Sequence, residues 1–439
     1  MVPIALGYHP RLMTRPSRQD WRILLVIFWL TSCVEGIGVS QIFAFVPRYL
    51  ETMGVAEADR LHFVGLFGAL IFVVGMPLVP LWGVWADKYS RKVVIVRSAI
   101  VEAVVFGSIA LSREPWQLAL SMLLVGFQLG NTGIMLGAIR DAVPRARIGT
   151  ALSLFGSSSP IGFAIGPVVG GLIVDRFGWG LPAVFAISAA LSVGTALLVA
   201  VGSQEVRPDV IPVGRSLDLA FGALRGVLGD HPTRRIFGIF FVAFLANQVM
   251  RPYVPVLVAR VNGPLQVASA IGLVTGTAAL IGALVAPLGG WLGDRIGYRP
   301  VLVAALLGGG VSGLILPLAP SVPLLALVAF AAAGSYAVVA PMVFSLLGTE
   351  VPAARRSQTL NLVYLPLYLG GIIGPVLAAG VVGIGLAAPF VLAGVVFVGG
   401  AALIVVQARG GTPAAAPVAE RDEAGEPRID RRDADRVVR

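Results

Sequence analysis

The chain has 439 residues, of which 57% are hydrophobic and only 13% are charged, and its mean hydropathy is +0.88. A water-soluble domain carries about 25% charged residues, so this composition excludes an ordinary soluble protein. The formal net charge of +10 would suit a nucleic-acid-binding protein, but the basic residues stand in short clusters between long apolar runs, and this distribution argues against that class.

The apolar runs are about 20 residues long, which is the length that a helix needs to cross a bilayer. They predict an all-α membrane protein with twelve transmembrane helices in two pseudo-symmetric six-helix bundles. The predicted spans are residues 22–47, 61–83, 93–112, 115–139, 150–174, 179–202, 234–259, 267–291, 300–319, 322–347, 358–383 and 386–407.

The basic residues also predict the orientation of the spans. With a cytoplasmic N-terminus, nearly all Lys and Arg residues fall on the cytoplasmic side, as the positive-inside rule requires. We therefore expect both termini in the cytoplasm of a bacterium and a multi-pass protein in its inner membrane. The Lys and Arg residues outside that cytoplasmic set are Arg48, Arg60, Arg113, Arg176, Arg251 and Arg260.

The longest predicted inner connection, residues 203–233, follows six spans and marks the boundary between the two bundles. It separates a bundle at 22–202, preceded by a cytoplasmic segment at 1–21, from a bundle at 234–407. Residues 408–439 are rich in Ala, Pro, Arg and acidic residues and lack an apolar core, so we expect a disordered cytoplasmic tail.

A ten-residue signature occurs twice, after the second and the eighth predicted spans. Each copy contains Gly, three residues, Asp, a base, any residue, Gly or Ser, any residue and a base. Asp87 and Asp294 are 207 residues apart. A repeat of about half the chain predicts two similar halves, and in a membrane that arrangement is typical of a transporter with its site between them. The residues concerned are Gly83, Asp87, Lys88, Arg91 and Lys92, and Gly290, Asp294, Arg295 and Arg299.

Two further landmarks repeat in the same order. The stretch at 141–147 aligns with 349–355, and the stretch at 162–167 aligns with 370–375. With these motifs, the chain up to about residue 407 resembles a transporter of the major facilitator superfamily. The loop signature resembles that family's motif between the second and third spans. The fifth span resembles the glycine motif of its drug:proton antiporter and exporter branches, through Gly162, Gly166, Pro167, Gly170 and Gly171.

The resemblance implies roles for both motifs. It implies that the signature loops latch the cytoplasmic gate shut in the outward-facing state, whereas their bases could instead only determine topology. Gly83 is expected to permit a close helix approach. The fifth-span glycines recur every four residues, which predicts close helix packing, and we assign them no substrate contact. The fourth span carries Gln128 but lacks the intramembrane Arg before it that many antiporters have, which puts a carried-over proton mechanism in doubt.

Three charged residues are predicted inside the membrane, where an ionisable group needs a role or a partner. Glu35 and Arg251 lie about 20 Å and 24 Å into their spans at the helical rise of 1.5 Å per residue. Their similar depths allow an ion pair or a shared polar site, in which Glu35 binds a proton or a cationic substrate. A purely structural ion pair is the alternative. Glu102, only five residues beyond Arg97, is expected to be shallow and structural, with a proton-coupling role as the alternative.

Polar residues at helical spacing suggest three stripes along a cavity, each of which could instead serve packing. They are Gln128, Asn131 and Met135 in the fourth span, Asn247 and Arg251 in the seventh, and Asn361, Tyr364 and Tyr368 in the eleventh. The Tyr residues could hold flat apolar or cationic ligands.

The leading interpretation is a secondary active transporter that works by alternating access and exports a small amphiphilic compound or drug in exchange for protons. The alternatives are an importer or facilitator of a sugar, organic acid or lipid-like solute, and, more remotely, a polytopic membrane enzyme. The three histidines are scattered, and neither Lys follows a Gly as in a phosphate-binding loop. We expect no metal and no cofactor, a proton gradient as the energy source, and a monomer bound to bilayer and substrate but not to nucleic acid.

Overall fold

The computed structural model describes residues 20–208, 211–229, 231–350 and 364–410. All regular secondary structure within these ranges is helical. The first bundle consists of α1 (Trp21–Thr52), α2 (Glu57–Lys88), α3 (Arg91–Leu111), α4 (Pro115–Val125), α5 (Asn131–Ala142), η1 (Arg145–Arg147), α6 (Ile148–Gly156), α7 (Ser158–Asp175) and α8 (Leu181–Gly202). The central connection carries α9 (Ser216–Gly229).

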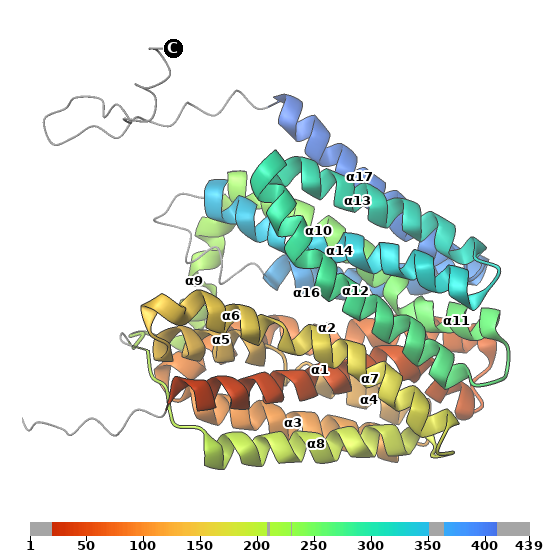
Figure 1. The fold of residues 1–439 in the computed structure, drawn as a ribbon, viewed down its shortest axis with the longest axis horizontal. Coiled ribbons are helices and arrows are strands. Elements are labelled where there is room, and N and C mark those ends of the chain that lie inside the picture. The colour runs from red at the N-terminus through yellow and green to blue at the C-terminus, as the bar shows by residue number, and fades with distance from the viewer. Residues whose placement is uncertain (1–19, 209–210, 230, 351–363, 411–439) are drawn as a thin grey trace, which may run out of the picture.

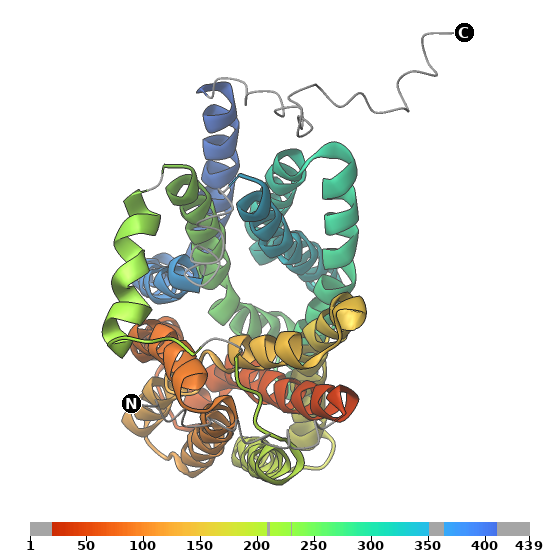
Figure 2. The same cartoon turned by 90° about the vertical axis from the view of Figure 1, so that its left-hand side faces the viewer.

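The second bundle consists of α10 (His231–Met250), η2 (Arg251–Tyr253), α11 (Val254–Asn262), α12 (Val267–Ile296), α13 (Tyr298–Ile315), η3 (Leu316–Leu318), α14 (Val322–Glu350), α16 (Tyr364–Val381), η4 (Val382–Ile384) and α17 (Ala388–Gly410). The two bundles meet where α7 packs on α12 and α2 packs on α16, and α9 runs beside both bundles (Figures 1 and 2).

Eleven of the helices and helix pairs are long and apolar enough to cross a membrane. The remaining predicted span, the fourth, is divided into α4 and α5 by a turn at residues 126–130. Neither piece alone reaches the length of about 20 residues that a bilayer requires. Together they complete a fold of twelve membrane-spanning helices, as the sequence predicts.

Both signature loops lie on the same face of the molecule. The first turns of α2 and α12 line one cavity of about 370 Å³, to which Glu57 and Arg60 contribute from α2 and Val267 from α12. The two helices therefore start at the same face and end at the other, where each carries its copy of the signature. We call the face with the two copies the signature face and the face with the cavity the opposite face.

The two bundles pack closely near the opposite face. Gly65 of α2 lies against the carbonyl oxygen of Pro375, so that a Cβ at this glycine would come within 2.6 Å of it. Gly171 of α7 faces the backbone of Ser269 in the same way, at 2.8 Å. Small residues let helix backbones approach this closely in a membrane, and they close the molecule at this face.

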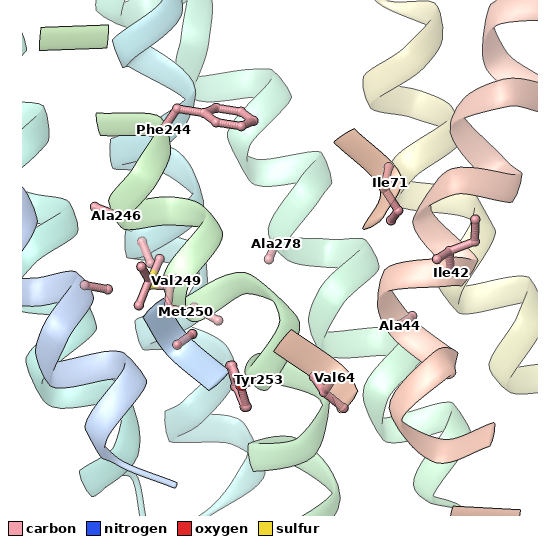
Figure 3. Packing of buried hydrophobic residues seen from close by; sticks show 14 of the residues in the cluster. Ile42, Ala44, Val64, Ile71, Phe244, Ala246, Val249, Met250, Tyr253 and Ala278 are labelled. Atoms are coloured by element: carbon pink, nitrogen blue, oxygen red, sulfur yellow. The ribbon is translucent and has the colours of Figure 1, made fainter. Parts of the chain in front are cut away.

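Buried apolar side chains from both bundles form one cluster (Figure 3). It includes Ile42 of α1, Val64 of α2 and Tyr253 of η2. Tyr253 is fully buried, and its hydroxyl donates a hydrogen bond of 3.0 Å to the carbonyl oxygen of Leu61 in the other bundle. Burying the phenol is favourable because its polar end has this partner.

Candidate functional site

Arg91 connects the first signature loop to the fourth span. Its Nε donates to Asp87 Oδ1 and its Nη1 to Asp141 Oδ2, each at 2.8 Å, and only 5% of its side chain is exposed. Asp141 lies in the last turn of α5. A charged guanidinium is stable in this buried place because both carboxylates neutralise it. All three residues belong to the first bundle, so in this arrangement the loop is bound to its own half.

The two lysines of the first copy contact the central connection instead of the second bundle. Lys92 Nζ donates to the carbonyl oxygen of Ser203 at 2.7 Å, and Lys88 Nζ to that of Gly214 at 2.8 Å. Glu205 accepts from the backbone N–H of Arg91 at 3.0 Å and from the Ser90 hydroxyl. A carboxylate at this position also complements the positive end of α3. These hydrogen bonds therefore hold the connection after α8 against the first signature loop.

The second copy makes different contacts. Asp294 Oδ1 accepts from the Tyr298 hydroxyl at 2.8 Å, and the Arg295 guanidinium lies 4.0 Å from the centroid of the Trp291 ring. Open space surrounds the Cβ positions of Gly83 and Gly290. The close helix approach predicted at Gly83 is thus absent from this arrangement, in which the bundles meet at the other face.

The fifth-span glycines pack against both neighbours of α7. Cβ atoms at Gly162 and Gly166 would come within about 3.0 Å of the α1 backbone, at Gly36 and Ile37 respectively. Gly170 faces the Phe45 ring of α1, and Gly171 faces α12. Pro167 lies in the middle of the helix, and its carbonyl oxygen faces Gly272 of α12. These residues bring α7 close to the first and the eighth spans.

Asp175 makes a second polar contact between the bundles. At the end of α7, its Oδ2 accepts from the backbone N–H of Ser269, in the first turn of α12, at 2.6 Å. The Ser269 hydroxyl donates to the carbonyl oxygen of Gly171 at 3.2 Å. A carboxylate at a helix N-terminus satisfies free N–H groups and is favoured by the helix dipole. Asp175 lies at the end of a span and in no motif, so the sequence does not predict this contact.

Glu35 lies in the middle of α1, where it is half-buried. Asn131 Nδ2, at the start of α5, donates to Glu35 Oε2 at 3.5 Å. Within the described ranges, Glu35 is not one of the acids that form ion pairs. The ion pair with Arg251 that similar depth allows is therefore not formed in this arrangement.

Glu102 of α3 is buried inside the first bundle, with only 3% of the residue exposed. It forms no ion pair with a base in the described ranges. Its Oε1 has no hydrogen-bond partner among the described residues. The carboxylates of Glu102 and Glu35 are near enough to repel each other when both are charged.

The fourth span does not carry its polar stripe on one helix. Gln128 lies in the turn between α4 and α5 and is 1% exposed, and its amide has no partner among the described residues. Asn131 is the first residue of α5, after Gly130, whose φ of 95° favours glycine. Met135 is fully buried in the core of the first bundle. The turn brings Asn131 to Glu35 and leaves Gln128 apart from it.

Arg97 and Ser98 of α3 hold this turn. Arg97 Nη1 donates to the carbonyl oxygen of Phe127 at 2.8 Å, and the Ser98 hydroxyl donates to that of Gln128 at 2.9 Å. The guanidinium stacks 3.6 Å from the centroid of the Trp82 ring. Carbonyl oxygens freed by a helix break in a membrane need such partners. In the sequence Arg97 falls among the cytoplasmic bases, and no motif there predicts this role.

Arg251 lies in η2, which interrupts the seventh span between α10 and α11. Its Cζ is 3.8 Å from the centroid of the Phe43 ring of α1 and 5.3 Å from that of Phe163 of α7. Asn247, one turn earlier on α10, is buried. Asn247 lies four residues before Arg251, at the junction of α10 and η2, so the shared face that the sequence predicts stays a prediction.

The eleventh span is described only in part. Asn361 and the side chain of Tyr364 lie outside the described residues. Tyr368 is buried, and its ring centroid is 5.9 Å from that of Phe72 in the other bundle. Phe72 in turn meets Phe244 of α10 edge-on at 6.2 Å. Aromatic side chains of both bundles thus lie in the interior of the molecule.

Comparison with known proteins agrees with this architecture. The model of the Major Facilitator Superfamily matches residues 28–268 and 236–434. The chain is 31% identical over 297 residues to the multidrug resistance protein MdtG of Citrobacter koseri, covering 66% of this chain and 70% of that protein. It is 27% identical over 300 residues to MdtG of Proteus mirabilis, covering 66% and 72%.

Solved structures of low sequence identity share the fold. The nucleoside transporter NupG, in a point-mutant form, superposes with a TM-score of 0.72 at 17% identity over 88% of this chain and 98% of that chain. A bacterial homologue of the human lysosomal transporter Spinster, in an inward-facing and occupied conformation, gives 0.71 at 17% identity over 90% and 98%.

Proposed function

Because the chain belongs to the major facilitator superfamily and is a multi-pass membrane transporter, we propose that it exports a small amphiphilic compound in exchange for protons. The relatives named as multidrug resistance proteins support export. Alternating access requires that the two bundles rock about a site between them, so that only one face is open at a time.

The contacts between the bundles support a state closed at the opposite face. Tyr253 and Leu61 form one hydrogen bond across the interface there, and Ser269 and Asp175 form another. At the signature face, Arg91 pairs with acids of its own bundle. If the basic signature face is cytoplasmic, as the positive-inside rule predicts, this is the inward-facing state that takes up a solute for export.

The proposal of proton coupling rests on the environment of Glu35. It is a carboxylate in the middle of a membrane-spanning helix, and within the described part of the chain its hydrogen-bonding partner is the neutral amide of Asn131. A charged carboxylate is costly in such a place without a cation, whereas a protonated one is not. Glu35 therefore gains or loses a proton at a cost that depends on how much water reaches it, which differs between the two states.

Asn131 connects Glu35 to the signature loop through α5. It begins α5, whose last turn carries Asp141, the partner of Arg91. The two ends of this helix are about 15 Å apart at 1.5 Å per residue. The turn at 126–130 separates α5 from α4, so α5 is able to move as a rigid piece. We propose that a change at Glu35 reaches the signature loop through α5.

Flux into proteoliposomes with an imposed pH gradient tests this function. We expect the native protein to move a fluorescent amphiphile against its concentration gradient only when the proton gradient runs in the opposite direction. Glu35→Gln cannot change its charge, so we expect it to lose uphill transport and keep solute exchange at equal pH. Glu57→Gln, at the exposed start of α2, is the matched control and should transport normally. Full uphill transport by Glu35→Gln would exclude Glu35 from coupling.

A further inference from the structure

Arg251 is a cation of the second bundle that reaches into the first. It lies in η2, and its guanidinium is held over Phe43 of α1 and near Phe163 of α7. Stacking on the face of an aromatic ring stabilises a guanidinium partly taken out of water. The two rings thereby help to hold the group in position.

The aromatic rings do not satisfy the hydrogen-bonding capacity of the guanidinium. Its N–H groups are strong donors that need an acceptor such as a carboxylate oxygen. Within the described ranges, the Arg251 side chain has no hydrogen-bond acceptor and no ion-pair partner. The residue is half-buried, so its donors are not sealed inside the protein. The guanidinium is therefore a positioned cationic donor that has no acceptor among the described residues.

Neither Glu35 nor Glu102 is the acceptor for the Arg251 guanidinium. Glu35 lies eight residues before Phe43 on α1, about 12 Å away at the helical rise, and contacts Asn131. Glu102 is buried within the first bundle. A buried charge without a counter-charge is unfavourable, and a ligand that carries the opposite charge relieves the cost.

Neighbouring groups of the second bundle suit an anion as well. Tyr336 of α14 lies near enough to interact electrostatically with Arg251, and its hydroxyl makes no hydrogen bond to any described residue. Asn247, one turn before Arg251, adds an amide. The ring of Phe244 packs 6.3 Å from that of Tyr336 and provides an apolar wall beside these donors.

We propose that the Arg251 guanidinium edge and the Tyr336 hydroxyl bind the carboxylate of an amphiphilic organic anion, whose apolar body lies against the aromatic side chains of both bundles. The inference rests on the proposed transport function and names the class of solute. A planar guanidinium binds a carboxylate through two parallel hydrogen bonds, which Lys cannot reproduce. A cationic amphiphile would meet a like charge at this point.

Binding of two probes with the same apolar body and opposite charge tests the proposal. The probes are 1-pyrenebutyrate and a pyrenebutyl trimethylammonium salt, titrated at pH 8 into the purified full-length protein and followed by fluorescence anisotropy. We expect the native protein to bind the carboxylate at least about tenfold more tightly than the ammonium, since a charged hydrogen-bonded pair contributes that much.

The variants separate recognition from structure. Arg251→Gln should lose the preference for the carboxylate probe. Its affinity for the carboxylate should fall about tenfold or more, and its affinity for the ammonium less than twofold. Arg251→Lys should give an intermediate result. Tyr336→Phe should lower the affinity for the carboxylate probe a few-fold and leave the affinity for the ammonium probe unchanged. It also tests the proposal if Arg251→Gln fails to fold. Arg260→Gln, exposed on α11, is the control and should bind as the native protein does.

Three results would overturn the proposal: native protein that binds neither probe, native protein without preference for the carboxylate, or Arg251 and Tyr336 variants that weaken both probes equally. These results concern equilibrium binding without a gradient. The proposed proton coupling fails separately, in flux experiments with Glu35→Gln.

Discussion

Tyr253 ties the two bundles together through a single polar atom. Its ring is fully buried at the opposite face, and its hydroxyl reaches Leu61 across the interface. The bond exists only while the bundles are closed at this face. It therefore stabilises one of the two states that alternating access requires, and its loss should shift the balance between them.

Tyr253→Phe removes this hydrogen bond and keeps the buried ring. We expect the closed state to lose about 1 kcal/mol, the net contribution of a typical hydrogen bond, or somewhat more because the Leu61 carbonyl oxygen loses its partner. Labelling of a cysteine placed at Pro264, beside the cavity of the opposite face, should then be about fivefold faster. Tyr49→Phe, whose hydroxyl bonds to Ser112 within the first bundle, is the control. Unchanged labelling in Tyr253→Phe would show that the hydroxyl does not stabilise closure.

At the residue scale, the sequence predicted where the charged residues lie along their helices better than it predicted their contacts. Glu35 and Arg251 do lie in the interior of the helices, but they bind an amide and two aromatic rings instead of each other. Pairing depends on the relative position of two bundles, which differs between states. A single sequence encodes both states and does not indicate which contacts belong to which.

At the scale of elements, the interruption of the fourth span is the feature that hydropathy conceals. Residues 115–139 form one apolar run, and glycines such as Gly126 and Gly130 are common in continuous membrane helices. The structure shows instead a turn held by Arg97 and Ser98 from α3. The run's length predicted the span correctly, whereas its break depends on donors supplied by another helix.

Arg97→Gln should destabilise this turn. The carbonyl oxygen of Phe127 loses a charged donor, and the Trp82 ring loses its cation, so we expect a loss of about 1–3 kcal/mol in the free energy of unfolding. Hydrogen exchange at residues 126–131 should become faster, together with a lower melting temperature in detergent. Arg176→Gln, exposed after α7, should change neither quantity. Equal effects of both substitutions would show that Arg97 does not hold the turn.

The helix-packing motifs were the most predictable elements. The four-residue spacing of the glycines in α7 indicates a flat helix face, and the structure places that face against α1, with Gly171 against α12. Packing of this kind depends on the absence of side chains and is therefore visible in sequence. Gly83 shows what such spacing does not predict, namely the state in which a contact forms. Its Cβ position has open space around it in this state.

At the scale of the whole molecule, the repeat of 207 residues predicted two bundles, and the fold has them. Both signature copies lie on one face, because α2 and α12 start beside the same cavity. The bundles are closed at the opposite face by apolar packing, by the hydrogen bond of Tyr253 to Leu61, and by the hydrogen bonds of Ser269 with Asp175 and Gly171. Opening at this face has to break these contacts, and alternating access requires that contacts at the signature face replace them.

The central claim is that the protonation of Glu35 governs which face is closed. Spin labels on cysteines at Asp59 and Leu265, exposed on the two bundles at the opposite face, report their separation by double electron–electron resonance in a Cys33→Ala background. The account predicts a distance distribution that changes between pH 5.5 and pH 8 in the otherwise native protein and is the same at both values in Glu35→Gln. A native distribution indifferent to pH, or an undiminished change in Glu35→Gln, would contradict it.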